Sequence, residues 1–262
     1  MAGLLLVSSH PASGKSALAA GLARRLQAAS VEISEAEAGP IADALAANPG
    51  ARVIIVATPA DSTAEIAGFV RSAGPVAGVI VNRVQPRRVD AVRAEYEAAG
   101  VRPLVVIPED GVLAAPTLGQ LAAALEADSE NLAGNEGRVL DRPVIASIAA
   151  DPGQTYFTRT AAEAVIVRSD KPDLQLGALN ASATSCLIMT GGLPVLSYVL
   201  DRVRDNEVPL LRTKLDTRQT VEVLESLFGT APFAGDEKTR RMAELLGDLD
   251  IDALLERAAG TA

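Results

Sequence analysis

Several residue types are scarce in this chain of 262 residues, and each shortage excludes a class of structure. Aromatic residues make up 3% of the sequence and tryptophan is absent, although 48% of the residues are apolar. The core must therefore be built from alanine, valine, leucine and isoleucine, a composition typical of parallel sheets covered by helices. The single cysteine, Cys186, cannot form an internal disulfide, and we expect it to be buried and inert. The single histidine, His10, cannot anchor a Cys/His zinc site.

Basic residues are also in the minority, and this balance of charge disfavours anionic partners. The chain has 24 lysines and arginines against 33 acidic residues, a net charge of −9. Binding to nucleic acid needs clustered Lys and Arg, so we expect no nucleic-acid partner and no docking on anionic membranes. No apolar run approaches the roughly 20 residues that span a bilayer. The first residues also lack the features of a signal peptide, so the sequence predicts a soluble, cytoplasmic protein.

Short apolar runs alternate with helical patterns in the first half of the sequence. The runs predict strands at 4–8, 31–35, 53–57, 76–81 and 104–107, and the patterns predict helices at 15–28, 41–47, 63–72, 87–99 and 118–127. Two of these helices begin with a capping-box signature, Ser62 with Glu65 and Thr117 with Gln120. Such alternation indicates βαβ units, so the predicted fold class is α/β, with a parallel sheet flanked by helices.

A polar stretch at 128–138 separates this region from a second, smaller α/β region. The second region has predicted strands at 144–148, 164–167, 186–189 and 210–211 and predicted helices at 194–205 and 217–226. A charged tail with an amphipathic helical pattern follows. We therefore expect a first domain at 1–127, a linker at 128–138, a second domain at 139–230 and a helical tail at 231–262.

The first predicted strand–helix junction carries a phosphate-loop (P-loop) pattern, Ser9-His10-Pro11-Ala12-Ser13-Gly14-Lys15-Ser16. In such a loop, backbone amides and a helix N-terminus hold phosphates, the lysine reaches the terminal phosphates and the hydroxyl ligates magnesium. Ser9 stands where the pattern has its first glycine. The pattern predicts a nucleotide site made by Ser9, Ala12, Ser13, Gly14, Lys15 and Ser16, with Ser16 on magnesium. A degenerate loop that keeps only the turn is the alternative, and we expect His10 to be exposed.

Polar residues that follow the other predicted strands are expected at the same sheet edge as Lys15. They are Glu35, Thr58, Asp61, Asn82, Arg83, Glu109 and Asp110. Asn82 could pair with an adenine edge or form an Asx turn before the next helix, and both interpretations stay open. Glu35 could hold magnesium through water or be a surface charge.

Two further local patterns occur in the second region. The turn Thr190-Gly191-Gly192 follows an apolar run, and its amides could cradle an anion. Paired glycines also allow a tight turn and close packing, and we favour this structural interpretation. Asp216 precedes a helical pattern, and we expect it to cap that helix.

The order of these motifs resembles a known combination of domains. Residues 8–16 are similar to the first loop of the dethiobiotin synthetase-like ATPases, where a small hydroxyl residue also replaces the leading glycine. Residues 78–84 are similar to their adenine-contacting Asn segment. Residues 107–110 and 113–117 resemble the version of this domain at the N-terminus of long bacterial phosphate acetyltransferases, and 187–192 with 215–217 resemble the DRTGG domain that follows it there.

The resemblance implies a P-loop ATPase-like domain joined to a smaller α/β DRTGG domain, as in the regulatory part of those acetyltransferases or in their free-standing relatives. It implies that ATP or a related nucleotide binds with Mg, that Asn82 and Arg83 contact the nucleotide, and that Glu35 lies on the magnesium side. Glu32 or Glu37 could equally take the place of Glu35. It does not imply acetyl transfer, because we expect the catalytic domain of that reaction to be lacking.

The leading hypothesis is therefore an ATP-binding regulatory or sensory protein with weak or no ATPase activity. The segment between the first helix and Arg52 is short for the family, which leaves little chain to position an attacking group. The second domain would sense a second ligand or form a homodimer, through apolar surface at 187–189 and 193–200. The alternatives are an ATP-dependent ligase or kinase-like enzyme acting on a small carboxylate, and a scaffold with an inactive loop.

Overall fold

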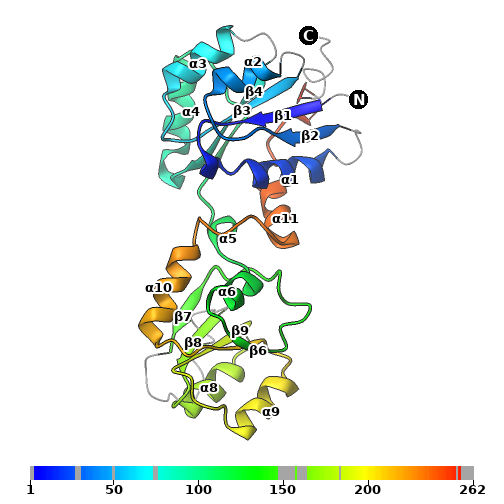
Figure 1. Ribbon diagram of the computed structural model, residues 1–262. Helices are drawn as coiled ribbons and strands as arrows, with labels where there is room; N and C mark the ends of the chain where they lie inside the picture. Colours follow the sequence, from blue (N-terminus) through cyan, green and yellow to red (C-terminus); the bar gives the residue numbers. More distant parts are fainter. Residues whose placement is uncertain are drawn as a thin grey trace. The chain divides into compact units, whose positions relative to one another are not determined.

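The computed structural model describes residues 3–26, 31–48, 51–72, 76–146, 157, 164–182, 184–251 and 253–254. The chain divides into two compact units, one formed by Met1–Leu113 with Lys238–Ala262 and the other by Ala114–Glu237 (Figure 1). Each unit contains a five-stranded sheet with helices on its faces. The α/β fold class predicted from the sequence is therefore confirmed for both units.

The first unit is built on five parallel strands in the order β2-β1-β3-β4-β5. Their bounds are β1 (Gly3–Val7), β2 (Glu32–Glu35), β3 (Arg52–Ala57), β4 (Val76–Val84) and β5 (Val105–Pro108). Strand β1 lies between β2 and β3, so the strand order reverses beside it. Open parallel sheets bind ligands at such a switch point, beyond the carboxyl ends of the strands. The end of β1 is therefore the place where this fold favours a ligand.

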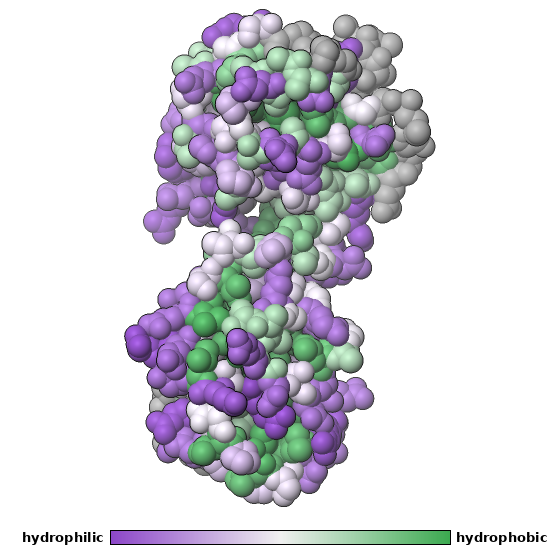
Figure 2. All heavy atoms as spheres, in the orientation of Figure 1, coloured by the Kyte–Doolittle hydropathy of each residue, from purple (hydrophilic) through white to green (hydrophobic). Residues whose placement is uncertain are grey.

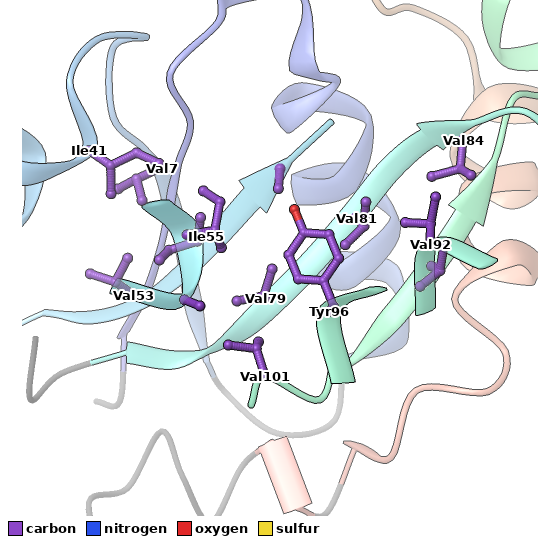
Figure 3. Packing of buried hydrophobic residues seen from close by; sticks show 14 of the residues in the cluster. Val7, Ile41, Val53, Ile55, Val79, Val81, Val84, Val92, Tyr96 and Val101 are labelled. Carbon is purple, nitrogen blue, oxygen red and sulfur yellow. The ribbon is translucent and has the colours of Figure 1, made fainter. Parts of the chain in front are cut away.

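Helices cover both faces of the first sheet. They are α1 (Lys15–Arg25), α2 (Ile41–Ala47), α3 (Thr63–Ser72), α4 (Val89–Ala98) and α11 (Asp236–Leu245), with short turns η1 (Pro11–Ser13), η2 (Pro86–Arg88) and α5 (Gly111–Ala114). On one face, alternate strand residues such as Val7, Ile55 and Val81 pack with side chains of α2, α3 and α4 (Figure 3). On the other face, Gly21 of α1 has no room for a Cβ atom, which would lie 2.5 Å from Cγ of Met242. Helices α1 and α11 therefore pack in close contact.

The second unit has a sheet of order β6-β10-β9-β8-β7, in which β6 is antiparallel to β10 and the other pairs are parallel. The strands are β6 (Asp128–Glu130), β7 (Pro143–Ile145), β8 (Ala164–Arg168), β9 (Cys186–Thr190) and β10 (Leu210–Arg212). The helices are α6 (Leu118–Ala124), α8 (Pro172–Leu179), α9 (Ser197–Asp205) and α10 (Thr217–Leu227). Side chains of α8 and α9 pack on one face, and those of α6 and α10 pack on the other.

The structure differs from the sequence expectations at the boundary between the units. The stretch 128–138, expected as a linker, contains β6, and Glu130 pairs with Leu210 of β10. Its side chains are mostly exposed, so an apolar pattern does not mark this edge strand. The units divide at residues 113/114 and 237/238 rather than at residue 127, and the tail from Lys238 belongs to the first unit.

Other differences concern single elements. Helix α8 was not predicted, although its Pro172 stands in the first turn, where proline is tolerated. All residues of β9 are buried, so the expectation that 187–189 offers apolar surface for pairing is wrong. Parts of three predictions lie outside the described residues: 147–148 of a strand, 27–28 of a helix, and 252 with 255–262 of the helical tail. No helix in the described part of the chain is long and apolar enough to cross a membrane.

Candidate phosphate-binding site

The predicted phosphate loop joins the end of β1 to the start of α1. Gly14 precedes the helix with a φ of 85°, in the left-handed region that favours glycine. A Cβ atom on Gly14 would lie 2.4 Å from Nδ2 of Asn82, so the site excludes a side chain for a second, steric reason. In the described residues, the amides of Lys15 and Ser16 have no hydrogen-bond acceptor. The loop therefore presents free donors at a helix N-terminus, as an anion site requires.

Lys15 is the charged group of this loop, and it is held inside the unit. Its side chain is buried, and Nζ donates a hydrogen bond of 2.6 Å to Oγ of Ser8. Oγ of Ser8 in turn donates to the carbonyl of His10. Burial lowers the pKa of Lys15, and the nearby carboxylate of Glu35 raises it in part. Lys15 forms no ion pair with the described residues, so a phosphate would supply the counter-charge that the ammonium lacks.

Ser16 and Glu35 lie together at the same edge. Oγ of Ser16 donates to Oε2 of Glu35 at 3.0 Å, which brings the hydroxyl of α1 to the last residue of β2. Glu32 pairs with Gly3 at the opposite end of β1, so it does not face the loop. Mg²⁺ in nucleotide sites takes one or two protein oxygens beside water and phosphate oxygens. The hydroxyl and the carboxylate fit that ligand set, although no cluster of three metal-binding side chains occurs among the described residues.

A β-bulge in β4 directs two consecutive side chains to the loop. The register with β5 shifts between Val81 and Val84, and Arg83 has a φ of 58°, which is unusual for a residue with a side chain. Nδ2 of Asn82 donates to the carbonyl of Ser13 at 2.8 Å. Nη1 of Arg83 donates to the carbonyl of Ala12 at 2.6 Å. Both residues therefore support the backbone of the loop, a role that neither the adenine nor the Asx-turn interpretation of Asn82 includes.

Asp61, in the loop after β3, holds the other end of the phosphate loop. Its carboxylate accepts hydrogen bonds from Oγ of Ser9, from the amide of Thr58 at 2.7 Å and from Oγ1 of Thr58 at 2.9 Å. Nε2 of His10 lies 3.5 Å from Oδ1 of Asp61, while half of the His10 side chain stays exposed, as expected. Burial, with the negative charge of Asp61 nearby, raises the pKa of Tyr96 to about 12.

A cavity of about 360 Å³ opens beside the phosphate loop. Its wall has apolar residues, such as Pro59 and Val92, and polar groups that include His10, Arg83, Arg88 and Glu109. A ligand held by the loop would therefore have adjoining space with both cationic and apolar walls.

The structure brings all the predicted site residues to one edge of the first sheet: Ser9, Ala12, Ser13, Gly14, Lys15, Ser16, Glu35, Asn82 and Arg83. The carbonyl groups of Ala12 and Ser13 accept the hydrogen bonds from Arg83 and Asn82. The buried hydroxyl of Ser13 has no partner among the described residues. Sequence reasoning missed Ser8, whose hydroxyl lies next to the pattern. It noted Asp61 at the sheet edge but assigned it no role.

The glycine turn of the second unit has a different character. The amides of Gly191 and Gly192 donate to the carbonyls of Leu215 and Thr213, and the amide of Leu193 donates to Oγ of Ser169. These donors are used within the unit, which supports the structural interpretation of this turn.

Three helix ends and the single cysteine were also predicted from the sequence. Asp216 caps α10 in a full capping box with Gln219, and Thr117 does the same for α6 with Gln120. Ser62 accepts from the amide of Glu65, at 3.4 Å. Cys186 is fully buried, and burial raises the pKa of its thiol to about 12, so the thiol stays protonated and inert.

Several solved structures share a limited likeness with the chain. The CBS and DRTGG domains of the regulatory region of Clostridium perfringens pyrophosphatase, solved with the activator diadenosine tetraphosphate, are 16% identical, with a TM-score of 0.39 over 69% of this chain and 76% of that chain. A carbohydrate transporter from Acidothermus cellulolyticus is 10% identical, with a TM-score of 0.28 over 93% and 97% of the two chains. D-lactate dehydrogenase from Lactobacillus jensenii is 12% identical, with a TM-score of 0.28 over 98% and 97%. Scores this low carry no argument about fold or ligand.

A family model matches the sequence of the second unit. It covers residues 120–227, which lie inside the unit Ala114–Glu237. The matched segment begins within α6 and ends at the last residue of α10, so it includes the whole second sheet. Residues 120–227 of this chain form a DRTGG domain.

Proposed function

We propose that the first unit binds ATP or a related nucleotide with Mg, and that the protein is a regulatory or sensory one in which the DRTGG domain responds to a ligand or mediates assembly. The observation that carries this proposal is the combination at the end of β1: among the residues that the structure describes, a buried ammonium has no ion pair and the helix amides beside it have no acceptors. Lys15 and these amides supply the donors that phosphate groups require.

Magnesium would complete this site at Ser16 and Glu35, the hydroxyl and carboxylate that lie 3.0 Å apart. When bound, the ion would neutralise part of the phosphate charge. The residues of the chain orient the loop: Asn82 and Arg83 hold its carbonyls, and Gly14 lets the backbone turn into α1. The nucleoside would extend from the loop into the adjoining cavity, where Arg83 and Val84 form part of the wall.

We expect slow or absent turnover. Phosphoryl transfer depends on a group that positions the attacking water or substrate. The carboxylate of Asp61 already accepts bonds from Ser9 and Thr58, and that of Glu35 accepts from Ser16. The alternative function, a ligase or kinase-like enzyme acting on a small carboxylate, is favoured by one observation. The cavity has room beside the loop, and its wall carries the cationic side chains of Arg83 and Arg88.

Lys15→Ala provides the direct test of nucleotide binding. Calorimetric titration of the whole chain with ATP, with and without Mg²⁺, should show affinity at least about 10-fold weaker in the variant, because a charge-assisted contact to phosphate is lost. Lys171→Ala, which removes an exposed lysine of the second unit, is the matched control and should bind as the wild type does. Equal affinity in the wild type and Lys15→Ala would contradict the site.

A phosphate-release assay on the same samples separates the two functions. A regulatory protein should bind ATP and release phosphate far more slowly than the usual enzymatic median of about 10 per second. Rapid release that increases with an added small carboxylate would instead favour the enzyme.

The DRTGG domain is the part for which we propose self-association. Three large apolar side chains around the start of α9 are exposed, Leu193 by 54%, Leu196 by 45% and Tyr198 by 50%. Figure 2 shows that hydrophobic residues lie among hydrophilic ones on the visible surface of this unit. An isologous pair of such patches would remove these side chains from water in a symmetric dimer.

A further inference from the structure

We infer that Asp61 is a positioning residue that fixes the phosphate loop, through a clasp between its carboxylate and the hydroxyl of Ser9. The role of this contact in nucleotide binding rests on the proposed function. The clasp itself joins two loops that follow neighbouring parallel strands, β1 and β3, at the switch point of the first sheet. The first loop carries the phosphate-binding pattern, and the second contributes part of the cavity wall.

The carboxylate of Asp61 is fixed by its own loop before it meets the phosphate loop. The amide of Asp61 donates to the carbonyl of Thr58 at 3.0 Å, so the chain forms a tight turn. Oδ2 accepts from the amide of Thr58 at 2.7 Å and from its hydroxyl at 2.9 Å. The side chain is 7% exposed. A carboxylate held in this way presents its remaining oxygen, Oδ1, in one direction.

Oδ1 of Asp61 receives the hydroxyl of Ser9. Ser9 is the loop residue at which the general pattern has a glycine, and a glycine has no hydroxyl to donate. A serine instead of a glycine at position 9 therefore adds a hydrogen bond that anchors the loop. Nε2 of His10, the next residue, lies 3.5 Å from the same oxygen, so two consecutive loop residues face this carboxylate.

The far end of the loop is anchored separately, by Asn82 on Ser13 and by Arg83 on Ala12. With Asp61 at the near end, the loop is held from both β3 and β4. A loop that is ordered before the ligand arrives loses less conformational freedom on binding, so its affinity is higher. The charge of Asp61 acts in the opposite direction, because a carboxylate near bound phosphates repels them. Positioning and charge therefore predict different outcomes for different substitutions.

The first measurement needs no ligand. Amide hydrogen exchange of the whole chain should become about 10-fold faster at residues 8–14 in Ser9→Ala and in Asp61→Ala, because loss of a hydrogen bond to a charged group makes local opening easier. Ser9→Thr keeps the hydroxyl and should keep the protection. Ser72→Ala, a serine on α3 whose hydroxyl bonds within the helix, is the matched control. Unchanged exchange at 8–14 in Ser9→Ala would overturn the inference.

The second measurement is the affinity for ATP with Mg²⁺. Ser9→Ala should weaken binding by about 10-fold, and Asp61→Ala by at least as much because it also removes the bonds to Thr58. The double variant should bind little more weakly than Asp61→Ala, because both changes remove the bond between Ser9 and Asp61. Asp61→Asn removes the charge and keeps one acceptor oxygen for Ser9, but its amide nitrogen cannot accept from Thr58, so its affinity should lie above that of Asp61→Ala. Tighter binding by Asp61→Ala would show that charge alone matters, and fully additive losses would show that the two residues act independently. Either result would overturn the clasp.

The two measurements separate the clasp from the proposed function. A wild-type chain that binds no ATP contradicts the proposed function, while the exchange experiment still decides whether Asp61 positions the loop. Should Asp61→Ala fail to fold, Ser9→Ala and Ser9→Thr carry the test, since they change one partly exposed hydroxyl.

Discussion

Both units place a glycine turn between a buried strand and a helix, but the two turns use their backbone donors differently. After β1, Gly14 leads into α1, and the amides of Lys15 and Ser16 have no acceptor in the described residues. After β9, the amides of Gly191 and Gly192 bond to carbonyls of their own unit. A glycine turn is therefore not a phosphate site by itself. What distinguishes the first turn is that its donors meet no acceptor in the described part of the chain and that a buried cation, Lys15, lies beside them.

The largest effect is expected when a glycine in each of the two turns is replaced by alanine. Gly14→Ala should weaken ATP binding by about 10- to 100-fold, because the left-handed backbone is strained and the Cβ atom meets Asn82 at 2.4 Å. Gly191→Ala has a similar φ, 92°, but its Cβ atom lies 3.4 Å from Oγ of Ser169. It should lower the free energy of unfolding by about 1–3 kcal/mol and leave ATP affinity unchanged. Calorimetric titration and thermal unfolding measure the two effects.

A matched control for the backbone strain lies in the first unit itself. Gly100 has a φ of 81°, and a Cβ atom there would meet no atom of the described residues within 4 Å. Gly100→Ala should therefore destabilise the unit without affecting ATP binding. If Gly100→Ala weakens binding as much as Gly14→Ala does, loss of stability rather than the loop explains the result.

Asn82→Ala should have the next largest effect on nucleotide affinity, and it tests whether the loop needs support from β4. Its amide is buried and supports the carbonyl of Ser13, so its loss should weaken ATP and GTP equally, by about 10-fold. Asn48→Ala removes a comparable side-chain bond, to the carbonyl of Ala44, and should change neither affinity. Calorimetric titrations with ATP and GTP give the ratio of the two affinities in each variant. A loss confined to ATP would show instead that Asn82 reads the base, as its resemblance to the adenine-contacting segment implies.

Much of this site was predictable from the sequence because it depends on local patterns. The apolar run before the loop predicted a strand at 4–8, and β1 spans Gly3–Val7. The helix was expected to begin at Lys15, and α1 does. Glu35 was one of three glutamates considered for the magnesium side, and the parallel pairing of β2 with β1 places it beside Ser16. Residues that are close together in the sequence can be placed from periodicity alone.

The contacts that hold the loop were not predictable in this way. Successive side chains of a regular strand point to opposite faces, so Asn82 and Arg83 should diverge. Both reach the loop because β4 carries a bulge, and the bulge exists only in its pairing with β5. The bond from Ser9 to Asp61 depends on β3 lying next to β1, a strand order that the sequence does not state. Strand β6 was not predicted because an exposed edge strand needs no apolar pattern.

The smallest expected effect on stability concerns the exposed patch of the DRTGG domain. Tyr198 is half exposed on the first turn of α9, so Tyr198→Ser should change the free energy of unfolding of the monomer by no more than about 0.5 kcal/mol. If the patch pairs with a second copy, the same change should weaken self-association at least about 10-fold, because buried aromatic side chains dominate such interfaces. Tyr198→Phe keeps the ring and should still pair. Light scattering across a concentration series measures both variants, and a wild-type chain that stays monomeric at high micromolar concentration would show that the patch serves no pairing between copies.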